Sequence, residues 1–197
     1  MLMNKSINVW HSGGWDLGGQ ASNTVKGLLC TNTSTPGNWL NVTGGKQYDV
    51  VHFNFGLHDL VDAGSVSLDP AEGAVHVEIP QYKLNLAELY RRLSGIGKKL
   101  IWTSTTPCPN VTTSMGRTDL KVRAYNDAAK EALAAAAAAA GRPFLEDDLY
   151  AAVEKYCGRD YKTCSLQRPA NVHFEPAGCE LMGRAVAQSV EDALLKK

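Results

Sequence analysis

The chain has 197 residues, of which 20 are Lys or Arg and 20 are Asp or Glu, so its formal net charge is zero. A chain of this length is expected to form one ordinary domain with a substantial core. The neutral balance, without a cluster of basic residues, argues against nucleic acid and against a membrane surface as partners. No run approaches the roughly 18 apolar residues that a membrane-spanning helix needs.

The first half of the chain contains two predicted strands and a helix. Residues 6–10 combine β-branched and aromatic side chains and lead into a Gly-rich segment, which predicts a short strand. A helix is expected to begin near Val25, after polar side chains that can cap it. Residues 50–55 are nearly all apolar, as in a strand of a parallel sheet that is covered on both faces. Residues 61–80 show weak periodicity and are expected to be irregular.

The second half alternates helices with strands. Apolar residues recur at helical spacing over residues 81–93. A long helix is expected from Asp119, which can cap it, to Ala140, and Pro176 suits the first turn of a final helix that ends at Leu195. The remaining predicted elements are strands at 99–105 and 142–145 and a helix at 147–156. This alternation predicts a single α/β domain over residues 1–197, with a parallel sheet and helices on both faces.

Three segments lie at the expected carboxyl ends of strands, where open parallel sheets hold their reactive groups. One is the loop after residues 6–10. The second is the turn at residues 56–59, Gly-Leu-His-Asp, which follows a predicted strand. The third contains His173, a lone histidine shortly before the final helix. Because these strand ends meet at one edge of a parallel sheet, we expect the three segments to lie together.

Residues 48–60 and 171–182 resemble the third and fifth sequence blocks of the SGNH (GDSL-type) hydrolases. A further likeness extends over residues 101–107, 122–128 and 157–174, so the resemblance covers most of the chain. It implies a three-layer α/β/α sandwich with a parallel sheet, similar to flavodoxin-like proteins. It also implies an ester hydrolase in which a serine attacks the ester carbonyl, a histidine takes its proton, and preorganised donors hold the oxyanion.

His173 matches the catalytic base of this family, and its flanking Val-His-Phe-x-Pro-x-Gly pattern supports the match. Histidine suits this role because it titrates near neutrality; the alternative is a histidine that packs at the N-terminus of the last helix. The family's acid lies three residues before the histidine, and that position here is Ala170. Asn171 lies close by but carries no carboxylate. Without the acid, a backbone carbonyl can orient the histidine, so a dyad remains chemically feasible.

The oxyanion side of the site is expected in two places. Gly56, His58 and Asp59 stand where the family has Gly-x-Asn-Asp, and a neutral imidazole has an N–H donor that can replace the asparagine. The alternative is a plain turn in which Asp59 caps the next segment. Ser22 falls where the family has its second-block glycine and can offer a backbone N–H. Asn23 is either part of this site or simply a helix cap.

The nucleophile is not evident, because no Gly-Asp-Ser segment occurs in the chain. In the family this segment ends a strand in the middle of the sheet, and unpaired backbone groups in a buried sheet are costly. Either residues 1–10 fill that place, or the sequence is an N-terminally truncated version of a longer protein, which we favour. Ser12, which follows a predicted strand, is the alternative nucleophile within this chain, although no helix begins directly after it.

Two features of the sequence suggest that the chain is related to proteins that work outside the cytoplasm. Cys157 and Cys164 bracket a short polar loop in which a small disulfide can form. Asn-x-Ser/Thr sequons begin at Asn4, Asn32, Asn41 and Asn110. The first residues lack the apolar core of a signal peptide, so the sequence leaves the localisation open. The cysteines lack Cys-x-x-Cys spacing, and we expect no metal site.

We therefore expect an SGNH-type ester hydrolase that acts on a small-molecule ester, in particular an acylated carbohydrate or lipid, as a monomer without a cofactor. Two rival hypotheses stay open. A domain with the same fold but without a nucleophile could bind such a ligand without turnover. A fragment without its central strand could lose several kcal/mol from a total stability of about 5–15 kcal/mol and be unstable.

Overall fold

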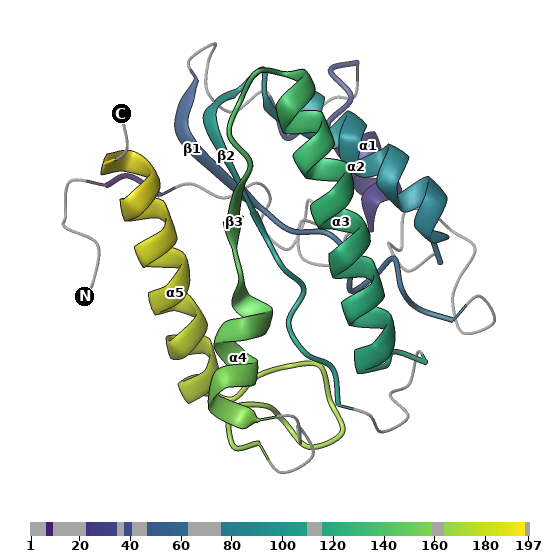
Figure 1. Ribbon diagram of the computed structural model, residues 1–197, viewed down its shortest axis with the longest axis vertical. Helices are drawn as coiled ribbons and strands as arrows, with labels where there is room; N and C mark the ends of the chain where they lie inside the picture. Colours follow the sequence, from purple (N-terminus) through teal and green to yellow (C-terminus); the bar gives the residue numbers. More distant parts are fainter. Residues whose placement is uncertain are drawn as a thin grey trace.

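The structure is a computed structural model that describes residues 7–9, 23–34, 38–40, 47–62, 76–109, 116–158 and 164–195. Its sheet contains the parallel strands β1 (Tyr48–Phe53), β2 (Gly97–Thr103) and β3 (Leu145–Asp147), in the order β1-β2-β3 (Figure 1). The predicted parallel sheet is confirmed within this part of the chain.

The strand predicted over residues 6–10 is wrong for the part that the structure describes. Residues 7–9 belong to no strand, and the Val9 side chain is 78% exposed. β-Propensity expresses how well a side chain fits a half-buried pleated surface, and an exposed valine has no such surface to pack on. The tertiary surroundings therefore override the local preference of this segment.

Helices cover both faces of the sheet. The described helices are α1 (Thr24–Cys30), α2 (Ile79–Leu93), α3 (Asp119–Ala139), α4 (Leu149–Cys157) and α5 (Pro176–Leu195). α2 and α3 pack against each other on one face, and α5 lies on the opposite face (Figure 1). The chain thus forms the three-layer α/β/α arrangement that was predicted.

The core lies between the sheet and the layer formed by α2 and α3. Tyr82, Leu86 and Leu89 of α2 are fully buried, as are Trp102 of β2 and Leu133 of α3. The α2 residues recur at intervals of three or four positions, so one stripe of the helix faces the core. Each buried leucine stabilises the fold by about 2 kcal/mol relative to an exposed one. Burial of this stripe therefore holds α2 in place beside the turn that follows β1.

Several element boundaries differ from the prediction by one to three residues. Thr118 caps α3, since its hydroxyl accepts a hydrogen bond from a first-turn N–H at 3.3 Å, and Asp119 is not the cap. Asp119 is the first helical residue, and its carboxylate accepts a hydrogen bond from the Tyr150 hydroxyl at 3.0 Å. β3 starts three residues later than predicted, and Arg142, which precedes it, donates to the carbonyls of Gly97 at the start of β2 and of Ser94 at the end of α2.

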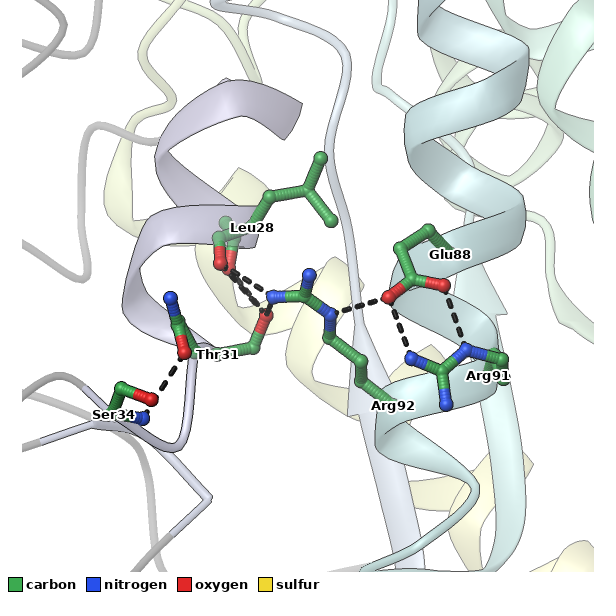
Figure 2. A network of polar contacts seen from close by, with 8 residues as sticks. Leu28, Thr31, Ser34, Glu88, Arg91 and Arg92 are labelled. Carbon is green, nitrogen blue, oxygen red and sulfur yellow. Dashed lines mark hydrogen bonds and ion pairs between the residues drawn. The ribbon is translucent and has the colours of Figure 1, made fainter.

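Arg92, a residue of α2, makes hydrogen bonds that connect α2 to α1 (Figure 2). Its Nη1 donates to the Leu28 carbonyl at 2.6 Å and to the Thr31 hydroxyl at 3.2 Å, at the C-terminal end of α1. Its Nε donates to Glu88 at 2.7 Å, and Glu88 also accepts two hydrogen bonds from Arg91. The hydrogen bonds from Arg91 and Arg92 lower the pKa of Glu88 from 4.5 to about 2. These contacts fix one end of α1 and so help to set where its other end lies.

No helix among the described residues has both the length and the apolar character needed to cross a membrane. Within the same ranges, no group of three or more His, Cys, Asp or Glu side chains could hold a metal ion.

Candidate functional site

The turn after β1 lies at the carboxyl end of the sheet and is held by β2 and α2. Asn54 Nδ2 donates to the Thr103 carbonyl at 2.7 Å, which ties the turn to the end of β2. The Tyr82 hydroxyl of α2 donates to the Phe55 carbonyl at 2.7 Å. Gly56 has a φ of 151°, and a Cβ at this position would lie 2.4 Å from a threonine hydroxyl oxygen. Only glycine fits this turn without displacing its neighbours.

Asp59 joins the turn to the N-terminal end of α1. Its Oδ1 accepts hydrogen bonds from the Thr24 backbone N–H at 2.8 Å and from the Thr24 hydroxyl at 2.6 Å. Its Oδ2 has no hydrogen-bond partner among the described residues. Burial raises the pKa of Asp59 from 3.8 to about 7, although the hydrogen bonds from Thr24 act in the opposite direction. Because the side chain is fully buried, Asp59 supports the turn from inside and is not exposed to a ligand.

Asn23 caps α1. Its Oδ1 accepts a hydrogen bond from the Lys26 N–H at 2.9 Å, and the side chain has no exposed surface. The structure thus supports the interpretation of Asn23 as a helix cap. Ser22 and Ser12 lie outside the described residues, so their roles as oxyanion donor and nucleophile stay predictions.

His58 is a half-buried side chain of the same turn and lies beside Arg117. Arg117 Nε donates to the Leu57 carbonyl at 2.9 Å, and its Nη2 makes a long contact of 3.5 Å with His58 Nδ1. Burial, followed by the positive charges of Arg117, Lys26 and His173, lowers the pKa of His58 from 6.5 to about 4. The ring is therefore neutral at neutral pH.

His173 lies in a short hairpin just before α5. The His173 carbonyl accepts a backbone hydrogen bond at 3.0 Å, and the Glu175 N–H donates to the Leu166 carbonyl at 2.9 Å across the hairpin. α5 begins close to this hairpin, since a Cβ on Gly178 would lie 2.4 Å from the Leu166 carbonyl oxygen. The His173 side chain is exposed, and its Nδ1 lies 2.6 Å from the side-chain oxygen of Asn171. The backbone around His173 is thus fixed while its imidazole stays accessible.

The fold brings the two predicted histidines into one region. A charge on His173 makes the smallest of the four contributions that lower the pKa of His58. Gln167 ties the His173 hairpin to the loop after β2, because its Nε2 donates to the Pro107 carbonyl at 2.9 Å. Two segments that are far apart in the sequence therefore meet at the carboxyl end of the sheet.

Cys157 and Cys164 are joined by a disulfide, with their Cα atoms 5.1 Å apart. This bond connects the last residue of α4 with the segment that leads into the His173 hairpin. It therefore limits how far the hairpin can move away from α4.

Sequence reasoning missed two polar contacts near the sheet. Arg117 follows a loop without periodicity or motif, so no signal in the sequence marked it as a neighbour of His58. His52 of β1 pairs with Asp147 of β3, with Nε2 and Oδ2 2.9 Å apart, and so bridges two strands across β2. The partners of this pair meet only when the crossover connections place β1 and β3 on either side of β2.

The fold is similar to that of two solved esterase structures. Both are variants of Axe2 from Geobacillus stearothermophilus, one described as an acetyl-xylooligosaccharide esterase and the other as an acetylxylan esterase. They match with TM-scores of 0.56 and 0.57 at 18% and 20% identity, and each match covers 85% of this chain and 68% of the other. No family model and no curated protein sequence matches the chain. The likeness shows the fold, and it agrees with the α/β/α sandwich implied by the resemblance to SGNH hydrolases.

Proposed function

We propose that this chain is an SGNH-type ester hydrolase and that its substrates are acyl esters, with acylated carbohydrates as the favoured class. The observation that carries this proposal is that the turn containing His58 and the hairpin containing His173 both lie at the carboxyl end of a parallel sheet, where Gln167 joins the hairpin to the loop after β2. The substrate class is supported by the acetyl-xylooligosaccharide and acetylxylan esterases that share this fold.

The two histidines suit different chemical roles. His173 is exposed and can take a proton from a nucleophile, the role of a general base, which contributes about 10²–10⁴-fold to rate. His58 has a pKa of about 4 and therefore offers a neutral N–H donor at neutral pH. A donor aimed at the oxyanion of the tetrahedral intermediate contributes about 10²–10³-fold. One histidine that accepts a proton and one that donates a hydrogen bond form a consistent acyl-transfer site.

The nucleophile has two candidate sources. Ser12 is the candidate within this chain, and the other is a Gly-Asp-Ser segment in a longer form of the protein. In either case the serine oxygen must come within about 2.6–3.2 Å of the free ring nitrogen of His173. No other serine is singled out by its place in the sequence.

A second candidate function is ligand binding without turnover. The lack of a Gly-Asp-Ser segment in the sequence favours it. A cleft that retains its oxyanion donors could still hold an acylated sugar, because function depends on the site and not on the fold.

The decisive experiment is to label the purified chain with a fluorophosphonate probe, map the labelled peptide, and measure hydrolysis of acetylated xylo-oligosaccharides. We expect one labelled serine, and a fall in hydrolysis of about 10²–10⁴-fold in His173→Ala. Arg184→Ala is the matched control, because Arg184 is an exposed residue of α5 that pairs with Glu180 on the same helix. It should label and hydrolyse as the unaltered chain does.

One outcome would count against catalysis, and another would count only against the role of His173. A chain that unfolds cooperatively on heating, yet takes no label and hydrolyses no ester, has no working nucleophile; saturable binding of the same sugars would then favour the binding domain. Full activity in His173→Ala would refute the role of His173 while leaving the esterase function intact.

A further inference from the structure

We infer that Asn171 is the positioning residue of His173, in the place that a carboxylate fills in most serine hydrolase triads. Asn171 Oδ1 lies 2.6 Å from His173 Nδ1 and 3.0 Å from the His173 backbone nitrogen. One side-chain atom thus contacts both the backbone and the ring of the same histidine. This inference rests on the proposed function for its catalytic meaning, but the contact can be tested without any activity.

The double contact decides which way the asparagine amide points and which ring nitrogen carries the proton. A backbone N–H can only donate, so the atom that it meets at 3.0 Å must be the amide oxygen and not the NH₂ group. The same oxygen can only accept, so Nδ1 of His173 must carry a hydrogen at a distance of 2.6 Å. In the neutral ring the lone pair is then on Nε2, which is the form that a general base requires.

The surrounding loop is shaped to make this contact. Ala170 has a φ of 52°, in the left-handed region that costs a residue with a Cβ roughly 1–2 kcal/mol. Such strain persists only where surrounding contacts hold it and is often found at functional sites. Residue 170 is also where the SGNH resemblance places the acid, and here it is an alanine. The left-handed residue Ala170 directly precedes Asn171, whose side chain contacts the histidine.

No other described side chain makes a hydrogen bond to the His173 imidazole. The backbone of His173 is held by the hairpin, through the isolated bridge between Gln167 and Phe174 and a bond to its carbonyl. The ring itself is exposed and can rotate unless Asn171 restrains it. Because an amide is neutral, Asn171 contacts the ring without adding the negative charge that a carboxylate would bring.

The test is the tautomer of His173 in the ¹⁵N-labelled full chain, read from two-bond ¹H–¹⁵N correlations of the imidazole rings at about pH 8. We expect a protonated Nδ1 in the unaltered chain and in Asn171→Asp, which keeps an acceptor in place. Asn171→Ala should lose this signal and show exchange between both tautomers. Ala170→Gly is the control, since it relieves the backbone strain but keeps the asparagine, and it should retain a protonated Nδ1.

A proton on Nε2 of His173 in the unaltered chain, or an unchanged spectrum in Asn171→Ala, would overturn the inference. As a control, a thermal unfolding curve of each variant should show that it is folded, since Asn171 lies in a surface hairpin. Where the chain hydrolyses esters, Asn171→Ala should lower kcat by up to about 100-fold with little change in KM. A protonated Nδ1 that depends on Asn171, in a chain without esterase activity, would count against catalysis by this chain and leave the positioning contact intact.

Discussion

Replacing Asp59 by asparagine should raise the stability of the protein above pH 7 and reduce its dependence on pH. Asp59 is fully buried, and its Oδ1 accepts two hydrogen bonds from Thr24 while its Oδ2 has no partner among the described residues. Asparagine has the same shape and keeps the accepting oxygen. Asp59→Asn therefore removes the buried negative charge and retains the contact with α1.

The magnitude follows from the pKa of Asp59, which burial raises from 3.8 to about 7. A difference of one in pKa corresponds to about 1.4 kcal/mol, so the ionised side chain costs the fold about 4 kcal/mol above pH 7. Since the folded protein binds this proton more tightly than the unfolded chain does, the contribution of Asp59 is most favourable below pH 3.8 and declines as the pH rises to about 7. In Asp59→Asn the N–H groups of the introduced amide would lack a partner, at a cost of about 1–3 kcal/mol at every pH.

The assay is urea unfolding of the unaltered chain and of Asp59→Asn at several pH values, followed by tryptophan fluorescence. Between pH 5 and pH 8 the free energy of unfolding of Asp59→Asn, relative to the unaltered chain, should rise by about 2–3 kcal/mol. Above pH 7 the variant should be the more stable protein by about 1–3 kcal/mol.

Asp49→Asn is the matched control, because Asp49 is an exposed side chain that pairs with Lys98 at the surface. Its effect should stay within about 0.5 kcal/mol at each pH. If the difference between Asp59→Asn and the unaltered chain is the same at pH 5 and pH 8, the carboxyl is not desolvated in the folded protein and the reasoning is wrong.

Three further tests, two of them with a control variant, address contacts in and around the site. Gly56→Ala adds a methyl group 2.4 Å from a hydroxyl oxygen at a φ of 151°, so a thermal melt should show a loss of more than about 2 kcal/mol; a loss below about 1 kcal/mol would mean that the turn can relax. Gly178→Ala places a Cβ 2.4 Å from a carbonyl oxygen and should lower the free energy of unfolding by about 1–3 kcal/mol. In the control Gly183→Ala, the added Cβ has nothing within 4 Å and should stabilise α5 by up to about 1 kcal/mol. Equal effects of the two substitutions on stability would contradict the close approach at Gly178. Arg92→Ala should destabilise the protein by about 1–2 kcal/mol in urea unfolding, because it leaves the carbonyl at the end of α1 without its hydrogen-bond donor. The control Arg91→Ala should destabilise it by less than about 0.5 kcal/mol. A larger loss of stability in Arg91→Ala than in Arg92→Ala would disprove the role given to Arg92.

The sequence alone determined the type and order of most elements. The periodic apolar residues of α2 and the polar capping signal before α3 placed both helices within about two residues of where they lie, and Pro176 marked the start of α5. The sequence also singled out His58 and His173, because each stands in a recognisable local pattern after a strand or before a helix. These features depend on neighbouring residues in the chain, and so they can be found without knowing the fold.

Only the tertiary structure decided how these segments meet. It left residues 7–9 outside the sheet, buried Asp59 against α1, and placed Arg117 beside His58. The contact between Asn171 and His173 lies next to a left-handed residue, Ala170, and alanine in the sequence gives no sign of that conformation. Each of these outcomes is set by contacts between distant segments or by a strained backbone, because burial and hydrogen bonding across the fold can outweigh local preferences of only a few tenths of a kcal/mol to about 1 kcal/mol.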